Sequence, residues 1–305
     1  MLLCKKVSKC CGDVVNYKKW LLKNTENLRG KRIAVTGATG GIGIHLCEYL
    51  ALLGADLILL NRDLSKSEAL ITDLKNKYSD INIKFIELKL DNIDSVKLAV
   101  ESLKYEMPDI IIHNAGAYSI PRYITELGID NVFQINCIAP LYISHELLYT
   151  FSEKGGRVVF VGSIAHNYSK TNVENFDFSK YSAASKVYGN AKRCLMLTAY
   201  ELFKNEKNVS YSVTHPGITF TNITNHYPKL IFAIIKNPMK IIFMRPKKAA
   251  LSVLKGVFED CGYGEWIGPR IFDVWGLPRK KYLKTFTESE AESVYDNALK
   301  ILQKI

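Results

Sequence analysis

Residues 36–43 read Thr-Gly-Ala-Thr-Gly-Gly-Ile-Gly, directly after the apolar run 33–35 and directly before a helix-like stretch at 44–53. Gly37, Gly41 and Gly43 lack Cβ atoms, so the backbone can turn sharply there and approach a ligand closely. A phosphate at such a turn meets the positive N-terminus of the following helix. The stretch therefore predicts a strand, a nucleotide-binding turn and a helix, with an ordinary glycine-rich turn as the alternative.

The rest of the chain alternates between short apolar runs and longer helical patterns. Strand-like runs lie at 57–60, 81–88, 110–113, 158–161 and 209–214, and helical patterns lie near 65–78, 93–105, 128–150, 181–205 and 247–258. Regular alternation of this kind, with nearly unbroken apolar strands, predicts a single-domain α/β fold. We expect a Rossmann-type doubly wound parallel sheet with helices on both faces, and ligands at the carboxyl ends of its strands.

The C-terminal part of the chain predicts three further features. Trp266–Pro269 is typical of a last strand, and Trp275–Pro278 of the exit turn that follows it. Residues 286–304 form an amphipathic helix that packs on the core or on a partner subunit, so self-association stays open. An apolar segment with interspersed lysines at 230–243 indicates a lid over a substrate site, placed at about 220–245, with a buried helix pair or shallow membrane contact as alternatives.

The positive charge is concentrated at the N-terminus. The net charge is +11, and +7 of it lies within residues 1–32, which contain nine lysines and arginines. A helix packed on the domain is the favoured interpretation, ahead of a helix lying at an anionic membrane surface. Nucleic-acid binding is not expected, since charge is the one feature that favours it. We therefore divide the chain into a basic extension at 1–30 and a domain at 31–305.

The composition is that of a globular protein, with 48% hydrophobic and 23% charged residues. No apolar run approaches the 18 or so residues that a membrane span needs. The seven cysteines form no CxxC pair and no paired Cys/His spacing, which argues against a zinc site and against a disulfide framework, and no metal is expected. These features favour a cytoplasmic protein, with peripheral membrane contact left open.

Five motifs follow one another along the chain. They are Thr36–Gly43, Asn114-Ala115-Gly116, Ser163 at the end of the fifth strand, Tyr188-Gly189-Asn190-Ala191-Lys192, and Pro216-Gly217 with Thr221 beyond it. In this order, over roughly residues 30–280, the chain resembles the short-chain dehydrogenase/reductase family. Within that family it is similar to retinol dehydrogenase-like and hydroxysteroid dehydrogenase-like members, which also have a loop such as residues 166–180 between the serine and the tyrosine.

The resemblance implies an oxidoreductase that transfers a hydride between a nicotinamide cofactor and an alcohol or carbonyl. It assigns Tyr188 as general acid/base, Ser163 as the group that hydrogen-bonds the substrate oxygen, and Asn136 as holder of a water next to Lys192. The implied cofactor-binding residues are Thr36, Gly37, Thr39, Gly41, Ile42, Gly43, Asn61, Arg62, Asp91, Asn92, Asn114, Ala115, Gly116, Tyr188, Lys192, Pro216, Gly217 and Thr221.

The chemistry of the Tyr188–Lys192 pair agrees with this assignment. Residues four apart share one face of a helix, so the ammonium can approach the phenol. A nearby cation favours a phenolate, and a phenolate can exchange a proton with a substrate oxygen. Tyr200 and Lys204 have the same spacing but lie farther along the helix, and we interpret them as an exposed face.

Cofactor choice depends on the end of the second strand. A carboxylate there suits the ribose hydroxyls of NAD, whereas a cation suits the 2′-phosphate of NADP. Asn61 stands at the strand end and Arg62 follows, which favours NADP(H) over NAD(H), although Asp63 could be the ribose acid. Asp91 resembles a residue that contacts adenine, and a helix cap is the other interpretation.

The expected substrate is a lipophilic alcohol or carbonyl, steroid-like or retinoid-like, because an apolar lid would suit such molecules. The alternative from another class is a nucleotide-sensing or interaction protein that keeps the fold without turnover.

Overall fold

The expected strand–turn–helix unit is present. The computed structural model describes residues 15–168, 171, 183–219 and 244–305. In it β1 (Arg32–Thr36) leads through the glycine-rich turn into α3 (Gly41–Leu52). The strand forms here because its apolar residues are all buried, and the helix begins where Gly40 adopts an extended conformation ahead of it.

Among the described residues, eight strands form one sheet, in the order β3-β2-β1-β4-β5-β6-β7-β8. Besides β1 they are β2 (Asp56–Asn61), β3 (Ile83–Glu87), β4 (Ile110–His113), β5 (Arg157–Val161), β6 (Ser210–Thr214), β7 (Glu265–Ile271) and β8 (Trp275–Tyr282). All neighbours are parallel except β7 and β8. The strand order reverses between β1 and β4, which is where doubly wound folds bind ligands.

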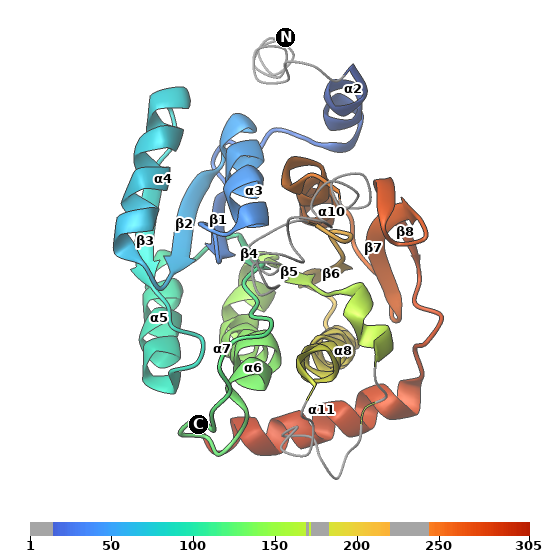
Figure 1. The fold of residues 1–305 in the computed structure, drawn as a ribbon. Coiled ribbons are helices and arrows are strands. Elements are labelled where there is room, and N and C mark those ends of the chain that lie inside the picture. The colour runs from blue at the N-terminus through green and yellow to red at the C-terminus, as the bar shows by residue number, and fades with distance from the viewer. Residues whose placement is uncertain (1–14, 169–170, 172–182, 220–243) are drawn as a thin grey trace, which may run out of the picture.

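Helices cover both faces of the sheet (Figure 1). One face carries α2 (Val15–Asn24), α3, α4 (Leu64–Lys77) and α10 (Pro246–Phe258). The other carries α5 (Ile93–Glu106), α6 (Asn131–Phe133), α7 (Ala139–Lys154), α8 (Ala184–Phe203) and α11 (Glu288–Leu302), together with the π-turn η1 (Gln134–Ile138). A short 3-10 turn, η2 (Ile164–Tyr168), follows β5.

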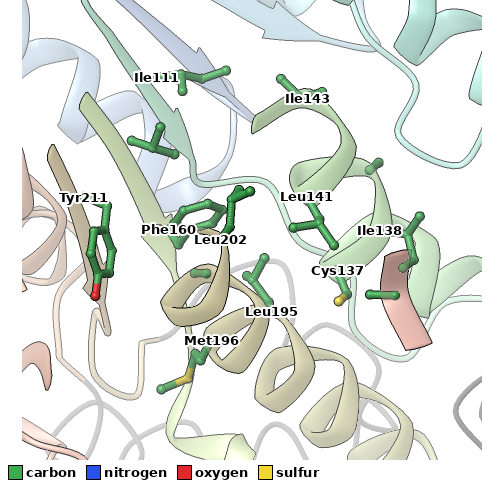
Figure 2. Close-up of a cluster of buried hydrophobic side chains, with 14 of the residues drawn as sticks. Ile111, Cys137, Ile138, Leu141, Ile143, Phe160, Leu195, Met196, Leu202 and Tyr211 are labelled. Atoms are coloured by element: carbon green, nitrogen blue, oxygen red, sulfur yellow. The ribbon is translucent and has the colours of Figure 1, made fainter. Parts of the chain in front are cut away.

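In the part of the chain that the structure describes, buried hydrophobic residues form two clusters, one on each face of the sheet. Successive strand residues point to opposite faces, so Ala34 joins one cluster and Val35 the other. Figure 2 shows the first cluster, in which Ile111 of β4, Phe160 of β5 and Tyr211 of β6 meet Leu195 and other side chains of α8. Because the strands are buried on both faces, their sequences are nearly continuous apolar runs.

The structure confirms the predicted fold class and corrects two elements. Trp275–Pro278 is not an exit turn: it begins β8, which pairs antiparallel with β7 at the edge of the sheet. The single helix expected at 128–150 is divided into α6, η1 and α7. η1 is a single turn of π-helix, which adds one residue to the α-helical repeat, and such turns often occur at functional sites.

Packing decides among the alternatives left open at the termini. Trp20 and Leu21 of α2 are buried in the second core cluster, which confirms a helix packed on the domain rather than one at a membrane surface. Ala291, Val294 and Ala298 of α11 are buried in the first cluster, so this helix packs on the core. Within the described residues no helix is long and apolar enough to cross a membrane.

The expected exposed face at Tyr200 and Lys204 is wrong. Tyr200 is fully buried, and its hydroxyl donates to Glu265 O at 2.7 Å, which ties α8 to β7. Lys204 pairs with Glu288 at 2.6 Å and Glu292 at 3.2 Å on α11. The C-terminal helix covers this part of α8, and helical spacing within α8 carries no information about such a distant partner.

Candidate active site

The glycine-rich turn needs glycine at particular positions. Gly37 has φ +64°, and a Cβ there would lie 2.9 Å from Ala115 Cα. A Cβ at Gly43 would lie 2.8 Å from Ala38 O and closer still to Gly37 O. The turn thus folds tightly on itself and on β4, and it leads into the first turn of α3, where Gly41, Ile42 and Gly43 stand. N–H groups at such a position lack partners within the helix and suit a phosphate.

The Asn114-Ala115-Gly116 segment fastens the end of β4 to this turn. Asn114 Nδ2 donates to Thr36 O and to Gly37 O, each at 3.1 Å. Ala115 N donates to Thr36 Oγ1 at 3.0 Å. These bonds couple the two strands at the point where the strand order reverses, and they agree with the steadying role that the family resemblance implies for Asn114.

Asn136 lies in η1 and is completely buried. Its Nδ2 donates to Ala117 O at 2.9 Å and to Val132 O at 2.8 Å, and its Oδ1 accepts from Ala117 N at 3.3 Å. A Cβ added at Gly116 would lie 2.8 Å from Asn136 Oδ1 and 3.3 Å from Lys192 Nζ. Gly116 therefore keeps open the space in which Asn136 and Lys192 approach each other.

Tyr188 and Lys192 occupy α8 and lie close together. Lys192 Nζ is 6.0 Å from the centroid of the Tyr188 ring and donates to Val161 O, at the end of β5, at 2.8 Å. Burial lowers the pKa of Lys192 to about 8, because the interior disfavours its charge. A cation in this position favours the phenolate form of a neighbouring tyrosine.

Ser163 lies two residues after the end of β5, and η2 after it packs against α8. Ser163 Oγ accepts from Ala165 N at 3.1 Å, and its carbonyl is 2.7 Å from His166 Nδ1. Since a carbonyl accepts but never donates, His166 Nδ1 carries a proton in this arrangement. The loop is thereby fixed at the strand end beside the helix that carries Tyr188 and Lys192.

Tyr118 is a residue of the site that the sequence motifs do not predict. Its ring meets the Tyr188 ring edge-on, with centroids 5.3 Å apart and an interplanar angle of 81°. Its position, two residues after Gly116, was the one indication in the sequence, because the segment after β4 passes along the sheet edge at which the other site residues lie. Tyr118 thus braces Tyr188 from the β4 side.

At the end of β2 the charged groups have separate roles. Asp63 caps α4: its Oδ1 accepts from Lys66 N at 3.0 Å, and its Oδ2 pairs with Lys66 Nζ at 3.2 Å. Arg62 is exposed and forms no salt bridge with any described residue, although its charge adds to the Lys66 hydrogen bonds that lower the pKa of Asp63. Asn61 is buried, and its Nδ2 donates to Ser67 Oγ at 3.0 Å. Asp63 is therefore occupied in capping, whereas Arg62 is available to an anion.

Two further expectations concern residues after β3 and β6. The N-cap of α5 is Asn92, whose Oδ1 accepts from Ser95 N at 2.7 Å. Asp91 is therefore not the cap, and its carboxylate accepts from Tyr123 Oη at 2.7 Å. Pro216 and Gly217 follow β6, and Gly217 has φ +87°. Thr221 and the expected lid at 230–243 lie outside the described residues.

Known proteins with sequences or folds similar to this chain identify its family. A family model described as short chain dehydrogenase matches residues 31–229. The chain therefore belongs to the short-chain dehydrogenase family, and the resemblance drawn from its five motifs is confirmed.

Several curated relatives are similar to the chain. Human polyprenol dehydrogenase is 28% identical over 210 residues, which cover 65% of this chain and 64% of that protein. Mouse retinol dehydrogenase 14 is 29% identical and covers the same shares. The chloroplastic short-chain dehydrogenase TIC 32 B of Brassica napus is 30% identical, covering 74% of this chain and 79% of its own length. The chain spans less than two thirds of the first two relatives.

Solved structures share the fold. A protein from Mycobacterium paratuberculosis matches with a TM-score of 0.72 and 20% identity, covering 92% of this chain and 96% of its own. A short-chain dehydrogenase from Sphingobium yanoikuyae in complex with NADPH matches with a TM-score of 0.54 and 22% identity, covering 64% and 74%. At these identities the likeness supports the Rossmann-type architecture and no finer statement.

Proposed function

We propose that the protein is an NAD(P)(H)-dependent oxidoreductase acting on an alcohol or carbonyl, with Tyr188 as general acid/base. The observation that carries the proposal is that Lys192 Nζ lies 6.0 Å from the Tyr188 ring centroid and, like the buried Asn136, next to Gly116, at the sheet edge that also bears the glycine-rich turn. A nicotinamide bound at this edge would supply the hydride or accept it. Family membership supports the same reaction class.

Each residue has a role that follows from its surroundings. Lys192 supplies a cation that favours the phenolate of Tyr188, so that Tyr188 can exchange a proton with the substrate oxygen. Ser163, held at the end of β5, is proposed to donate a hydrogen bond to the same oxygen. Asn136, fixed by Ala117 and Val132, would keep a water in place next to Lys192.

The glycine-rich turn fits a nicotinamide dinucleotide. The close approaches at Gly37 and Gly43 leave no room for a Cβ, and the start of α3 directs N–H groups toward a phosphate. Asn114 holds the turn against β4, and Gly116 has no side chain to fill the space beside Lys192. We assign the remaining cofactor contacts, including Asp91, Pro216, Gly217 and Thr221, on the family motifs.

The test of the reaction is the substitution Tyr188→Phe. If Tyr188 is the acid/base, turnover should fall by roughly 10²–10⁴-fold while NADPH still binds, since the ring and its packing are kept. A nucleotide-sensing protein on this fold would show no turnover before or after the change. NADPH binding by fluorescence, measured on both forms, separates loss of chemistry from loss of the site.

We propose NADP(H) as the preferred cofactor, because Arg62 is exposed and unpaired within the described residues whereas Asp63 is engaged with Lys66. Arg62→Ala should weaken NADPH binding about tenfold, the value of one lost charge-assisted contact of roughly 1.4 kcal/mol, and leave NADH binding unchanged. Lys75→Ala, on the exposed side of α4, is the matched control. Equal losses for NADPH and NADH would contradict the preference.

For the substrate we propose a lipophilic alcohol or carbonyl, steroid-like or retinoid-like. The support is the apolar segment 230–243 and the names of two relatives, polyprenol dehydrogenase and retinol dehydrogenase 14. A panel of steroid, retinoid and short polar carbonyls, each assayed with NADPH, tests this. Turnover of the polar compounds alone would exclude a lipophilic substrate.

A further inference from the structure

The turn between β7 and β8 combines two features that the fold alone does not explain. Residues 271–275, here called the β7–β8 tip, close a tight turn in which Val274 N donates to Ile271 O at 3.0 Å. Its central residues Phe272 and Asp273 have φ of +49° and +58°. Turns of this geometry favour Asn-Gly, and a bulky residue with positive φ is unusual. The phenylalanine is therefore unfavourable for the backbone at its position.

Packing does not compensate for this cost. The Phe272 side chain is 83% exposed, and its neighbours Ile271 and Trp275, paired across the turn, are exposed at 49% and 37%. Three large apolar side chains thus gather at one exposed point of the molecule. Exposed apolar side chains that gather at one point mark interaction sites more often than scattered ones do.

Cations flank the tip. Arg270 precedes it on β7 and Arg279 lies on β8, paired in register with Gly268. Both arginines are exposed, and neither forms an ion pair with a described residue. The nearby Asp273 is neutralised by Lys281, whose Nζ lies close to its carboxylate. The local charge around the three apolar side chains is therefore positive.

The tip also lies next to the proposed active site. His215 Nε2 is 2.9 Å from Asp273 O, and a Cβ at Gly217 would lie 2.9 Å from Val274 O. The Pro216–Gly217 segment therefore packs directly against the tip. Because β7 runs parallel to β6, its end at Ile271 lies at the same sheet edge as the ends of β5 and β6.

We propose that the β7–β8 tip is a membrane-docking site, in which Phe272, Ile271 and Trp275 enter the interface of an anionic bilayer while Arg270 and Arg279 contact lipid phosphates. Aromatic side chains favour the boundary between headgroups and acyl chains, and arginines near an anionic surface add attraction. The positive charge around the tip selects an anionic lipid surface over a second copy of this basic chain. The proposal does not depend on which substrate the enzyme uses.

Co-sedimentation of the full chain with vesicles tests the proposal. Wild-type protein should bind phosphatidylcholine vesicles that contain phosphatidylserine, and binding should weaken in salt. Phe272→Asn should weaken binding by roughly tenfold, since it removes a phenyl ring that the bilayer would take out of water. Asn tolerates positive φ, so the turn should be kept. Arg270→Gln should weaken binding by about fivefold.

Two controls make the outcome decisive. Tyr105→Asn removes an aromatic ring that is 85% exposed on α5, far from the tip in sequence, and should leave binding unchanged. Of the three tryptophans Trp20 and Trp266 are buried, so quenching by brominated lipid should report Trp275 and should be lost in Phe272→Asn. Equal binding by wild type and Phe272→Asn would overturn the proposal. So would a wild-type dimer that this substitution converts to a monomer.

Discussion

Lys192 is a buried cation whose titration should be visible in stability. Burial lowers its pKa from 10.5 to about 8. Between these values the unfolded chain holds a proton that the folded chain does not, so the free energy of unfolding rises as pH increases through this window. The gain is on the order of 3 kcal/mol.

Urea denaturation at several pH values measures this effect. The stability of wild type relative to Lys192→Met should increase between about pH 8 and pH 10, because methionine cannot titrate. A difference that stays constant over this range would show that Lys192 keeps an ordinary pKa in the folded protein.

Gly116 should be required for activity more than for folding. An alanine Cβ at this position would meet Asn136 Oδ1 at 2.8 Å, and Asn136 cannot move without breaking its bonds to Ala117 and Val132. Gly116→Ala should therefore displace Asn136 or Lys192 and lower kcat by roughly 10²-fold. Gly262→Ala is the matched control, since its Cβ would meet only the flexible Glu265 side chain. Similar kcat values for the two variants would argue against this role.

Among the elements, α11 braces the helix that carries Tyr188 and Lys192. Arg193 of α8 donates through Nε to Glu290 Oε1 at 2.6 Å and through Nη2 to Thr285 O at 3.0 Å. Thr171 also donates to Glu290. A carboxylate near the start of α11 therefore joins α8 to a residue of the segment that follows η2.

Glu290→Gln should lower the free energy of unfolding by about 1–3 kcal/mol, because the buried Arg193 would lose its charged partner. Burial raises the pKa of Glu290, but hydrogen bonds from Arg193 and Thr171 outweigh it, and the net pKa is lowered. The stabilisation is thus present at neutral pH and is lost as pH falls through the lowered pKa. The difference between wild type and variant should shrink in acid.

Glu292→Gln provides the comparison for Glu290→Gln in denaturant unfolding. Glu292 lies on the same helix and pairs with Lys204, but its side chain is half exposed, so its loss should cost less than about 1 kcal/mol. Equal destabilisation by the two substitutions would mean that the Arg193–Glu290 pair contributes no more to the free energy of unfolding than an exposed ion pair does.

Elements formed by local patterns were predictable from sequence, and those set by distant contacts were not. The strand at 110–113 was predicted to the residue because its apolar run is buried on both faces. The π-helical turn η1 was not predicted; in the structure its Asn136 bonds to Ala117, a contact that the pattern within 128–150 does not contain. The β8 strand was missed because its alternation is weak and its pairing with β7 defines it.

At the scale of the whole molecule, the candidate site is assembled from the ends of parallel strands together with residues of η1 and α8. Motifs with fixed spacing located Gly37, Asn114 and Ser163 near strand ends, which the parallel topology brings to one edge, and Tyr188 on the helix beside them. Tyr118 was missed, since its contact with Tyr188 depends on the path of the segment after β4. Motif spacing therefore identifies the residues that would carry the chemistry, whereas the residues that surround them are known only from the complete fold.

The N-terminal segment should be an integral part of the folded unit, although the sequence suggested a boundary near residue 30. Leu21 is 1% exposed and packs in the core cluster with α3, whereas its neighbour Leu22 is 41% exposed. Leu21→Ala should lower the free energy of unfolding by about 2–4 kcal/mol through lost burial and a cavity. Leu22→Ala, on the same helix and with the same change in chemistry, should cost less than about 1 kcal/mol. Urea denaturation of the two variants measures the difference. Equal, small effects would mean that α2 is only loosely attached and that the domain begins after it.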